Sequence, residues 1–421
     1  MGKLFYNIFL FLYSIAIRIV AFWSPKARRW INGRKDIFEK LQSQLPIANC
    51  QLLWMHCASL GEFEQGRTLL EVIKKKDPNL KIVLTFFSPS GYETMKDYKG
   101  VDHIFYLPMD SPSNAAKFID AIKPSLVLWV KYEYWFYYLD ELKRRNIPVV
   151  LVSGIFRKNQ PFFRWYGGIW RKMLASFTHF FVQNEESRSL LESIKITQGI
   201  TINGDTRFDR VIEIANNFQP VPFIDKFCGS ATVIVAGSTW EEDEVELLHY
   251  VKMNPQIKFI IAPHEIDSEN LKAVKKEFPN SIFYSELLPT TTYQLPTTPN
   301  VLIVDNIGML SRLYKYATIA YVGGAFGGDG VHNVLEAAVY GKPVVFGPEY
   351  EKFVEAIGLL EAGGGESISD PIELEKVLND LLNDDAERMQ QGSAAKDFVY
   401  SNAGASDQII RFIQEKRLLT S

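Results

Sequence analysis

Short apolar runs alternate with longer stretches of helical spacing along most of this chain, and no other feature restricts its fold as strongly. The runs hold four to six residues, the length of a strand, and a loop and a helical stretch follow most of them. Strands that helices cover on both faces read as continuous apolar runs and form parallel sheets. The strands expected from this pattern are residues 52–57, 82–87, 126–130, 149–153 and 180–183, and then 232–236, 258–262, 301–304, 319–322 and 343–346.

The pattern stops once and then restarts. Residues 216–222 (NNFQPVP) are polar and contain proline, which makes them the best candidate for a linker. A chain of 421 residues is long enough for two domains that each bury a full core. We therefore predict two doubly wound α/β domains, residues 24–218 and 219–421, with a ligand in the cleft between them, outside the carboxyl ends of the strands. Residues 288–299, rich in proline and threonine, are predicted to form a surface loop.

The first 35 residues differ from the rest of the chain. Residues 4–23 are mostly apolar and are about as long as a helix that crosses a bilayer core. Residues 1–35 contain seven cations and no acid, and five of these cations lie within residues 26–35, which should keep that flank cytoplasmic. No small-residue cleavage site follows, so we predict an uncleaved membrane anchor over residues 1–23. The alternative is an amphipathic helix that lies in the membrane surface.

Composition excludes several other classes of protein. Lysine and arginine number 46 against 49 acids, a net charge of −3, which argues against a nucleic-acid binder that works by bulk charge. The three cysteines, Cys50, Cys57 and Cys228, are too few for a disulfide framework or a paired-cysteine zinc site. A reducing compartment is therefore expected.

A first candidate site follows the first expected strand, in the sequence HCASLGEFEQG at residues 56–66. Glu62 is expected in the strand-to-helix loop, where a carboxylate can take a proton from a substrate hydroxyl as a general base. Gly61 would let the backbone turn tightly and approach a ligand. By residue type alone, a solvated loop acid or a carboxylate at a helix N-terminus is the commoner explanation. His56 is expected to be a packed strand residue rather than a base.

Two further loops come after the next strands of the first half. Residues 88–93 (SPSGYE) place Pro, Ser and Gly before a helix, where backbone N–H groups can bind an anion, although such a sequence is also a common turn. Residues 130–138 (VKYEYWFYY) contain Lys131 and Glu133 among aromatic side chains that suit core packing or contact with sugar and lipid.

Arg207, in the sequence GDTRFDR, is a candidate for stabilising negative charge on a substrate, because a guanidinium forks onto oxyanions. A surface ion pair with Asp205 or Asp209 is the alternative explanation.

Residues 323–348 (GGAFGGDGVHNVLEAAVYGKPVVFGP) give the strongest single signal. A strand ends there in a loop with five glycines, and a helix is expected from Asn333 to Gly341, so that backbone N–H groups can approach a phosphate. Asn333 and Glu336 share one face of the first turn, where a carboxylate can accept hydrogen bonds from ribose hydroxyls. The loop matches neither a Walker sequence nor the dinucleotide fingerprint. A flexible glycine turn with an asparagine cap is the alternative. AGSTWEEDE (residues 236–244) and APHEI (residues 262–266) are expected to line the same edge.

Taken in order, these segments resemble the bacterial 3-deoxy-D-manno-octulosonate (Kdo) transferases of lipopolysaccharide assembly. The resemblance covers nearly the whole chain and rests on the apolar N-terminus and on the sequences SLGE, SPSG, YEYW, QNEESR, GDTRFD, AGST and VHNVLEAAVYGKPVVFGP. It implies the twin-Rossmann GT-B architecture, with acceptor binding in the first domain and nucleotide binding in the second. It also implies transfer from CMP-Kdo to a lipid A precursor (lipid IVA), with inversion, without a cofactor or a structural metal, at the cytoplasmic side of the inner membrane.

The resemblance also assigns roles by position. Glu62 matches the general base, and Glu133 and Arg207 match positions that support the transition state. The residues that match acceptor-binding positions are Ser88, Ser90 and Gly91. Those that match CMP-binding positions are Pro263, His264, Ile307, Gly308, Met309, Asn333, Val334, Leu335 and Glu336.

Three departures from the family pattern bear on this assignment. Trp240 stands where a histidine is usual, and Lys131 stands where a glutamate is usual. Residues 263–267 (PHEID) replace an Arg-His-Pro-Glu-Arg stretch and lose both arginines. The alternatives are therefore another GT-B protein, such as a UDP-sugar transferase or epimerase, and a membrane-anchored nucleotide-sugar binder without catalysis. No Asp-x-Asp motif lies at a strand end, so no metal requirement is expected.

Overall fold

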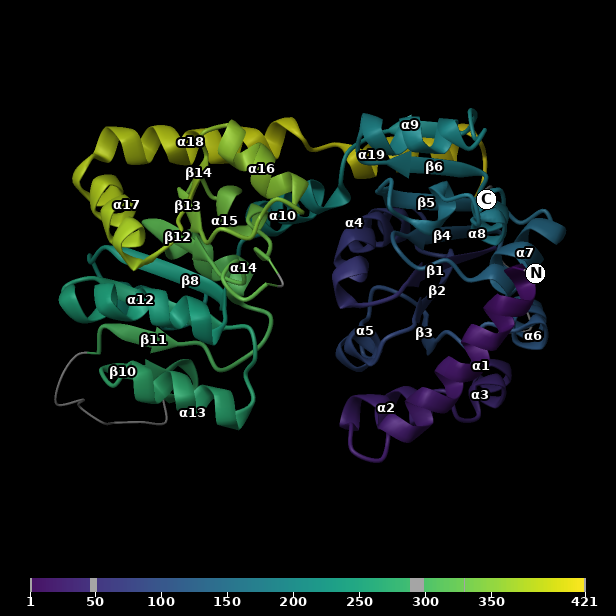
Figure 1. Cartoon of the computed structure of the whole chain (residues 1–421), viewed down its shortest axis with the longest axis horizontal. Coiled ribbons are helices and arrows are strands. Elements are labelled where there is room, and N and C mark those ends of the chain that lie inside the picture. Colours follow the sequence, from purple (N-terminus) through teal and green to yellow (C-terminus); the bar gives the residue numbers. More distant parts are fainter. Residues whose placement is uncertain (1, 46–50, 288–298, 329, 420–421) are drawn as a thin grey trace. The chain divides into compact units, whose positions relative to one another are not determined.

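The computed structural model describes residues 2–45, 51–287, 299–328 and 330–419. Contacts within the chain divide it into two compact units, residues 1–210 with 403–421, and residues 211–402. Each unit is built on one seven-stranded parallel sheet (Figure 1). The expected doubly wound α/β fold class is confirmed.

The sheet of the first unit has the strand order β3-β2-β1-β4-β5-β6-β7. Every side chain of its central strands β1 and β4 is buried, because helices cover both faces of the sheet. The strand order shows that the winding direction reverses between the neighbouring strands β1 and β4. Open α/β sheets bind ligands at such a place. The strands are β1 (Leu52–Cys57), β2 (Lys81–Phe86), β3 (His103–Tyr106), β4 (Leu126–Val130), β5 (Val149–Gly154), β6 (His179–Val182) and β7 (Ile200–Ile202).

The helices of the first unit follow its strands in turn, and most of their buried residues are apolar. They are α4 (Leu60–Lys76), α5 (Pro89–Met95), α6 (Pro112–Ile122), α7 (Phe136–Arg144), α8 (Gly168–Leu174), α9 (Glu185–Ser193) and the start of α10 (Thr206–Asn216). The last helix of the chain, α19 (Ala405–Glu415), also belongs here. Its residues Ile409, Ile410 and Ile413 pack in the core of the first unit, whereas the sequence pattern assigned residues 219–421 to one domain.

The sheet of the second unit has the strand order β10-β11-β9-β8-β12-β13-β14, and its winding reverses between β8 and β12. Its strands are β8 (Val233–Thr239), β9 (Lys258–Pro263), β10 (Ser281–Phe283), β11 (Val301–Ile303), β12 (Ile319–Val322), β13 (Val344–Phe346) and β14 (Gly365–Ser367). Its helices are α11 (Ile224–Cys228), α12 (Glu241–Met253), α13 (Ser268–Glu277), α14 (Leu310–Leu313), α15 (Leu335–Ala338), α16 (Val354–Glu361), α17 (Pro371–Asn383) and α18 (Asp385–Ser401).

All ten expected strands are present, with ends that differ by no more than a few residues. The expected helix from Asn333 to Gly341 is shorter, since α15 contains only Leu335–Ala338. The predicted surface loop at residues 288–299 lies almost entirely outside the described residues.

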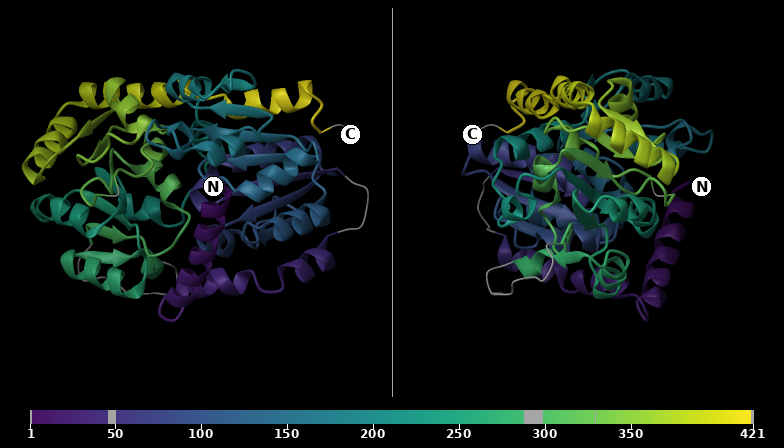
Figure 2. Two further views of the ribbon diagram at one scale, coloured as in Figure 1. Left: turned by 45° about the vertical axis from the view of Figure 1, so that its right-hand side comes forward. Right: turned by 90° about the vertical axis from the view of Figure 1, so that its left-hand side faces the viewer.

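Three helices precede the first strand, α1 (Gly2–Val20), α2 (Pro25–Gly33) and α3 (Ile37–Gln44), and the turn from α1 into α2 can be followed in purple in Figure 2. Ser24 accepts a hydrogen bond from the Ala27 N–H at 3.3 Å and caps α2, and Pro25 occupies the first helical position. By length and composition, α1 is long and apolar enough to cross a membrane, so it is a candidate anchor.

Candidate active site

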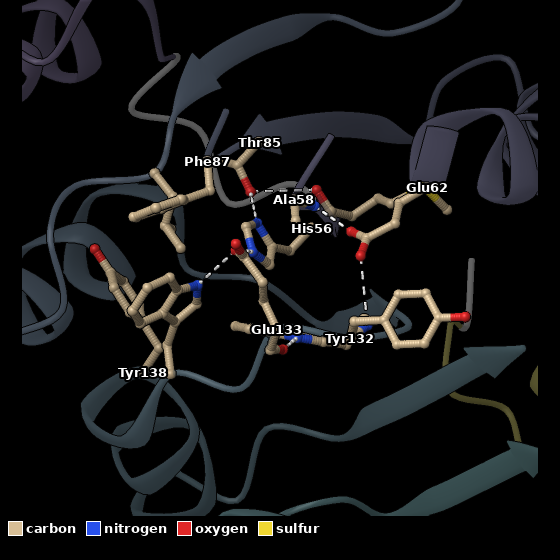
Figure 3. Close-up of polar contacts among 12 residues, drawn as sticks. His56, Ala58, Glu62, Thr85, Phe87, Tyr132, Glu133 and Tyr138 are labelled. Carbon is tan, nitrogen blue, oxygen red and sulfur yellow. Dashed lines mark hydrogen bonds and ion pairs between the residues drawn. The ribbon is translucent and has the colours of Figure 1, made fainter. Parts of the chain in front are cut away.

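Glu62 lies at the carboxyl end of β1, at the point where the first sheet reverses its winding. It is the third residue of α4, not a loop residue, because the helix begins at Leu60. Its side chain is only 6% exposed and accepts hydrogen bonds from the backbone N–H of Ala58 and, at 3.4 Å, from that of Tyr132 (Figure 3). The carboxylate thus bridges the loops that follow β1 and β4. Gly61 is helical and a Cβ there would meet no atom within 4 Å, so the turn itself does not require glycine.

Burial raises the pKa of the Glu62 carboxyl to about 7. The negative charge of Glu133 acts in the same direction, and the N–H groups of Ala58 and Tyr132 oppose it by stabilising the carboxylate. A carboxylate with a pKa near neutrality holds a substantial ionised fraction and still binds a proton well. This is the balance that a general base needs.

Glu133 lies beside Glu62 and is more accessible. Its side chain is 30% exposed, it accepts a hydrogen bond from the Trp135 indole at 3.2 Å, and its carboxylate is 3.9 Å from His56 Nε2 (Figure 3). His56 is fully buried, and its Nδ1 is 2.9 Å from Thr85 Oγ1. Burial lowers the pKa of His56, so its imidazole is neutral at physiological pH. As the sequence indicated, His56 is a packed strand residue. It lies next to the Glu133 carboxylate.

A buried group of charges lies at the neighbouring strand ends. Lys131 follows β4 with a left-handed backbone (φ 46°), and its Nζ is 3.2 Å from Asp205 Oδ2. The same oxygen accepts hydrogen bonds from Arg207 Nε at 3.0 Å and from Gln183 Nε2 at 2.7 Å. Burial alone would raise the pKa of Asp205, but Arg207 and Lys131 together lower it to about 2. Asp205 is therefore a permanent anion that fixes two cations.

This group bears on both explanations for Arg207. Arg207 forms an ion pair, as the alternative expected, but the partner is the buried Asp205, and the arginine side chain keeps 22% exposure. Asp209 has another task, since it accepts hydrogen bonds from the N–H groups of Gly404 and Ser406, both at 2.6 Å. The sequence did not single out Gln183 or assign Asp205 an organising role, because no local pattern marks a charge as buried.

The sequence SPSG forms the start of α5, where Ser88 caps the helix by accepting the Ser90 N–H at 3.3 Å. The Ser88 N–H donates to the Ala58 carbonyl at 2.7 Å, which ties this loop to the loop that carries Glu62. A Cβ on Gly91 would lie 2.2 Å from the Phe86 ring, so packing excludes any side chain there. Of the three predicted acceptor-binding residues, Ser88 shares a groove with Glu133, whereas Ser90 and Gly91 do not line it.

That groove has a volume of about 510 Å³ and lies between the N-terminal helices and the loop after β2. Its walls are mostly apolar and come from α1, α2 and Phe87, and Glu133 lies at one side of it. The residues that line it are Tyr13, Ala16, Ile17, Val20, Ser24, Lys26, Ala27, Trp30, Phe87, Ser88, Pro89 and Glu133. The candidate anchor and one candidate catalytic residue, Glu133, therefore border one space.

In the second unit, three aromatic side chains meet at the ends of β8, β9 and the loop after β12. The Trp240 indole donates a hydrogen bond to His332 Nε2 at 3.1 Å, so these two rings lie edge to edge. The exposed ring of His264 stacks on both, with centroid distances of 4.7 Å to Trp240 and 4.5 Å to His332. The departures at Trp240 and at residues 263–267 therefore occur at one place. Three neighbouring strands bring it together where the second sheet reverses its winding.

Asp243 connects this place to the glycine-rich loop. Its fully buried carboxylate accepts hydrogen bonds from the N–H groups of Trp240 at 2.9 Å and Gly324 at 2.8 Å, and from the Tyr321 hydroxyl at 2.8 Å. A Cβ on Gly323 would lie 2.8 Å from the same carboxylate, so glycine is required for this close approach.

The remaining predicted CMP-binding residues differ in what they offer a ligand. Asn333, which follows His332 in the sequence, donates to Glu336 Oε1 at 3.2 Å. Both side chains are half-buried. Val334 and Leu335 are fully buried, so only their backbone can reach a ligand.

The residues of the turn at 307–309 also differ in what they offer a ligand. Ile307 is 75% exposed, Gly308 has a left-handed backbone (φ 92°), and the side chain of Met309 is buried. Pro263 ends β9 and is buried, so it positions His264.

Within residues 2–45, 51–287, 299–328 and 330–419, no three His, Cys, Asp or Glu side chains gather in a way that could hold a metal ion.

Comparison with known proteins gives this geometry a context. Residues 32–210 match the family of 3-deoxy-D-manno-octulosonic-acid transferases. The chain is 26% identical over 424 residues to the 3-deoxy-D-manno-octulosonic acid transferase of Haemophilus influenzae, covering 94% of each protein. It is 28% identical over 358 residues to the Aquifex aeolicus transferase of the same name, covering 82% of this chain and 91% of that one.

A bifunctional glycosyltransferase/methyltransferase from Fusobacterium nucleatum is 25% identical over 413 residues. The match covers 94% of this chain but spans only 59% of that longer protein.

Solved structures show the same fold at low identity. UDP-GlcNAc 2-epimerase from Neisseria meningitidis, bound to UDP-GlcNAc, superposes with a TM-score of 0.60 at 14% identity, covering 87% of this chain and all of that one. A glycosyltransferase from Rickettsia africae gives a TM-score of 0.55 at 15% identity, covering 89% and 100%. The two-sheet architecture is thus the GT-B type, as expected.

Proposed function

Because the chain belongs to the family of 3-deoxy-D-manno-octulosonic acid transferases and is a glycosyltransferase, we propose that it moves Kdo from CMP-Kdo to a hydroxyl of a lipid A precursor. Relatives that carry this name match along 82% and 94% of the chain, which supports the choice of sugar. Lipid IVA is the proposed acceptor. The proposed location is the cytoplasmic side of the inner membrane.

The proposed reaction is a single displacement. The acceptor oxygen forms a bond to the anomeric carbon of Kdo, while the bond from that carbon to the CMP phosphate oxygen breaks. The electron pair of the broken bond leaves on the phosphate, and the proton of the acceptor hydroxyl moves to the Glu62 carboxylate. Because attack and departure occur on opposite faces of the carbon, the configuration inverts.

One observation carries this proposal, the environment of Glu62. The carboxylate is buried at the strand ends, two backbone N–H groups hold it, and its pKa is about 7. Asp205 is the contrasting case, because the two cations paired with it lower its pKa to about 2. Glu62 instead keeps a pKa at which it can accept a proton and release it again.

Glu133 and Arg207 support the reaction in the proposal. Glu133 borders the groove beside Glu62, where its partly exposed carboxylate can accept a hydrogen bond from an acceptor hydroxyl and orient it. Arg207 supplies positive charge near the bond that breaks. Asp205 holds its Nε edge, which fixes the direction of the guanidinium.

The groove suits an acceptor that is both sugar and lipid. Phe87 and Trp30 provide apolar wall, and Ser88 and Glu133 provide polar groups at one side. An acylated disaccharide can place a chain along the apolar wall and a hydroxyl at Glu133. We therefore propose that the first unit binds the acceptor.

The second unit is the proposed donor site. Phosphate contacts are assigned to His264 and to the backbone of the glycine-rich loop, and the ribose to Asn333 and Glu336. His264 offers a ring N–H to the donor phosphate at the place where the sequence lacks both arginines.

The test is product mass from detergent-solubilised full-length protein, CMP-Kdo made in situ and a tetra-acylated lipid A precursor. We expect the acceptor to gain the mass of one or more Kdo units, and Glu62→Gln to lower the rate by about 10²–10⁴-fold, the usual contribution of a general base. CMP affinity should stay within a few fold. Glu64→Gln on the same helix is the matched control and should keep its activity. An active Glu62→Gln enzyme would refute the base assignment.

The nucleotide separates this proposal from a UDP-sugar enzyme on the same fold. Calorimetry with CMP and with UDP should show preference for CMP. Tighter binding of UDP, with no Kdo transferred while a control transferase is active, would favour the UDP-sugar alternative.

A further inference from the structure

Helix α1 has two faces, and only one of them points to the first unit. Tyr6 and Leu10 are buried against that unit, and Tyr13, Ser14 and Ile17 continue the same row as half-buried residues. Their spacing of three and four residues is that of a single helical stripe. The stripe runs nearly the full length of the helix, so α1 lies along the unit rather than projecting from it.

Polar contacts fix the N-terminal half of α1 to this position. The Tyr6 hydroxyl donates to Asp110 Oδ2 at 2.6 Å and accepts the backbone N–H of Phe136 at 3.2 Å. At the next residue of α1, Asn7 Oδ1 accepts a hydrogen bond from the Tyr137 hydroxyl at 2.6 Å. At the start of the helix, the Lys3 ammonium lies 5.2 Å from the centre of the Tyr137 ring.

Asp110 makes these contacts costly to abandon. It is 2% exposed and also accepts the backbone N–H groups of Tyr137 at 3.0 Å and Tyr138 at 3.2 Å. Removing the Tyr6 hydroxyl would take the acceptor from the Phe136 N–H and one hydrogen-bond donor from Asp110. Leaving buried polar groups without a partner is unfavourable.

The outward face of α1 is apolar and exposed. Its large side chains include Leu4, Phe5, Ile8, Phe11, Leu12 and Ile15, and the helix is followed by the highly exposed Phe22 and Trp23. An apolar surface of this extent on a water-soluble protein marks an interaction site. Aromatic residues beyond the end of the helix suit the headgroup level of a membrane.

A spanning helix and the contacts of Tyr6 exclude each other. If α1 crossed a bilayer with its basic C-terminal flank on the side of the protein body, Tyr6 and Asn7 would lie near the far surface, beyond reach of Asp110 and Tyr137. We propose that α1 is an in-plane membrane helix, which stays docked on the first unit and buries its outward face in one leaflet of an anionic bilayer without crossing it.

The charge of the segment that follows α1 indicates that the bilayer is anionic. Lys26, Arg28, Arg29 and Lys35 follow the apolar helix and are all exposed. Cations at the membrane surface attract anionic lipid headgroups. The apolar face gives the depth of insertion and the basic segment gives the preference for anionic lipid.

The decisive experiment compares two single cysteines in the full-length protein. Gly2→Cys lies at the start of α1, and Lys158→Cys is an exposed position on the body of the first unit. Both carry Cys50→Ser, because Cys57 and Cys228 are buried, and the parent with Cys50→Ser alone is the blank. Intact cells and inverted membrane vesicles are treated with a membrane-impermeant maleimide.

We expect both cysteines to react in the same preparation, at similar rates. Reaction of Gly2→Cys from the side opposite to Lys158→Cys would show that α1 spans the membrane and would overturn the proposal.

A second measurement tests the two faces of α1 by flotation with vesicles of 3:1 phosphatidylethanolamine and phosphatidylglycerol. The double variant Phe5→Asp, Leu12→Asp alters the outward face only, and we expect vesicle binding to fall at least tenfold with the melting temperature unchanged. Tyr6→Phe alters the docked face and should lower the melting temperature while vesicle binding persists. Unchanged flotation of the double variant would overturn the lipid-facing assignment.

Discussion

Glu62 of the first unit and Asp243 of the second occupy equivalent places in their sheets. Each is the third residue of the helix that follows the first strand, α4 after β1 and α12 after β8. Each carboxylate turns back to accept a backbone N–H two residues beyond the end of the neighbouring strand, that of Tyr132 after β4 and that of Gly324 after β12. The two units thus use one device to join the loops where each sheet reverses its winding.

The two carboxylates differ in how completely they are paired. Asp243 is fully buried, and its three donors, Trp240, Gly324 and Tyr321, all lie within 2.9 Å. Glu62 has only two backbone donors, and the contact to Tyr132 is long, at 3.4 Å. Burial raises the pKa of both groups.

The difference shows how one backbone arrangement serves two purposes. A fully paired and buried carboxylate fixes two loops but cannot exchange a proton with a substrate. A carboxylate with one weak donor holds the same loops and retains the capacity to exchange a proton with a substrate. Functional and structural carboxylates are therefore distinguished by their donors rather than by their position in the sheet.

The largest effect on stability is expected from Asp243→Ala. The change leaves Trp240 N, Gly324 N and the Tyr321 hydroxyl without their acceptor, and unsatisfied buried groups cost about 1–3 kcal/mol each. Because such costs do not add fully, we expect a loss of roughly 2–5 kcal/mol in the free energy of unfolding of the second unit. Glu241→Ala, an exposed change in the same helical turn, is the control and should be nearly neutral in thermal and urea unfolding.

If Asp243→Ala melts as the unaltered protein does, the equivalence of the two carboxylates as loop supports fails.

The pH dependence of transfer sharpens the comparison at Glu62. Since the protonated carboxyl cannot accept a proton, kcat/KM should rise with pH through about 7 and should fall about tenfold for each pH unit below it. The residual rate of Glu62→Gln should lack this inflection. The supply of CMP-Kdo must not limit the rate at any pH. A profile that is flat between pH 5.5 and 8 would contradict the assignment.

The smallest effect is expected at His264, because several backbone groups share the donor phosphate in the proposal. His264→Ala should weaken CMP binding by roughly 3–10-fold in calorimetry, the loss of about one ordinary hydrogen bond. His249→Ala, an exposed histidine on α12, is the matched control and should leave the affinity unchanged. Equal affinities for the two variants would mean that His264 does not contact CMP.

The strands show where sequence reasoning succeeds. The ten expected strands are the five interior strands of each sheet, and the strands that the pattern did not reveal are β3, β7, β10 and β14, which lie at the four edges. Interior strands such as β1 and β4 are buried throughout and read as continuous apolar runs. Edge strands are shorter and only partly buried, as β7 is at all three residues, so their sequences resemble loops.

The candidate site also has features that the sequence reveals and features that it does not. Local sequence and family resemblance pointed to Glu62, Glu133 and His264, each of which follows an apolar run that is recognisable as a strand, and to Arg207 through the sequence GDTRFDR. They did not reveal that the Asp205 paired with Arg207 is buried, or that His264 rests on Trp240 and His332.

The sequence by itself determined the two-sheet architecture, because burial on both faces leaves a local apolar pattern that needs no distant partner to be read. The tertiary structure alone decided which groups became reactive and how the N-terminal helix lies. Glu62 receives its second donor from a residue 70 positions away, and Tyr6 meets Asp110 across 104 positions. Such contacts set burial, pKa and orientation, and they arise only when the folded chain brings distant segments together.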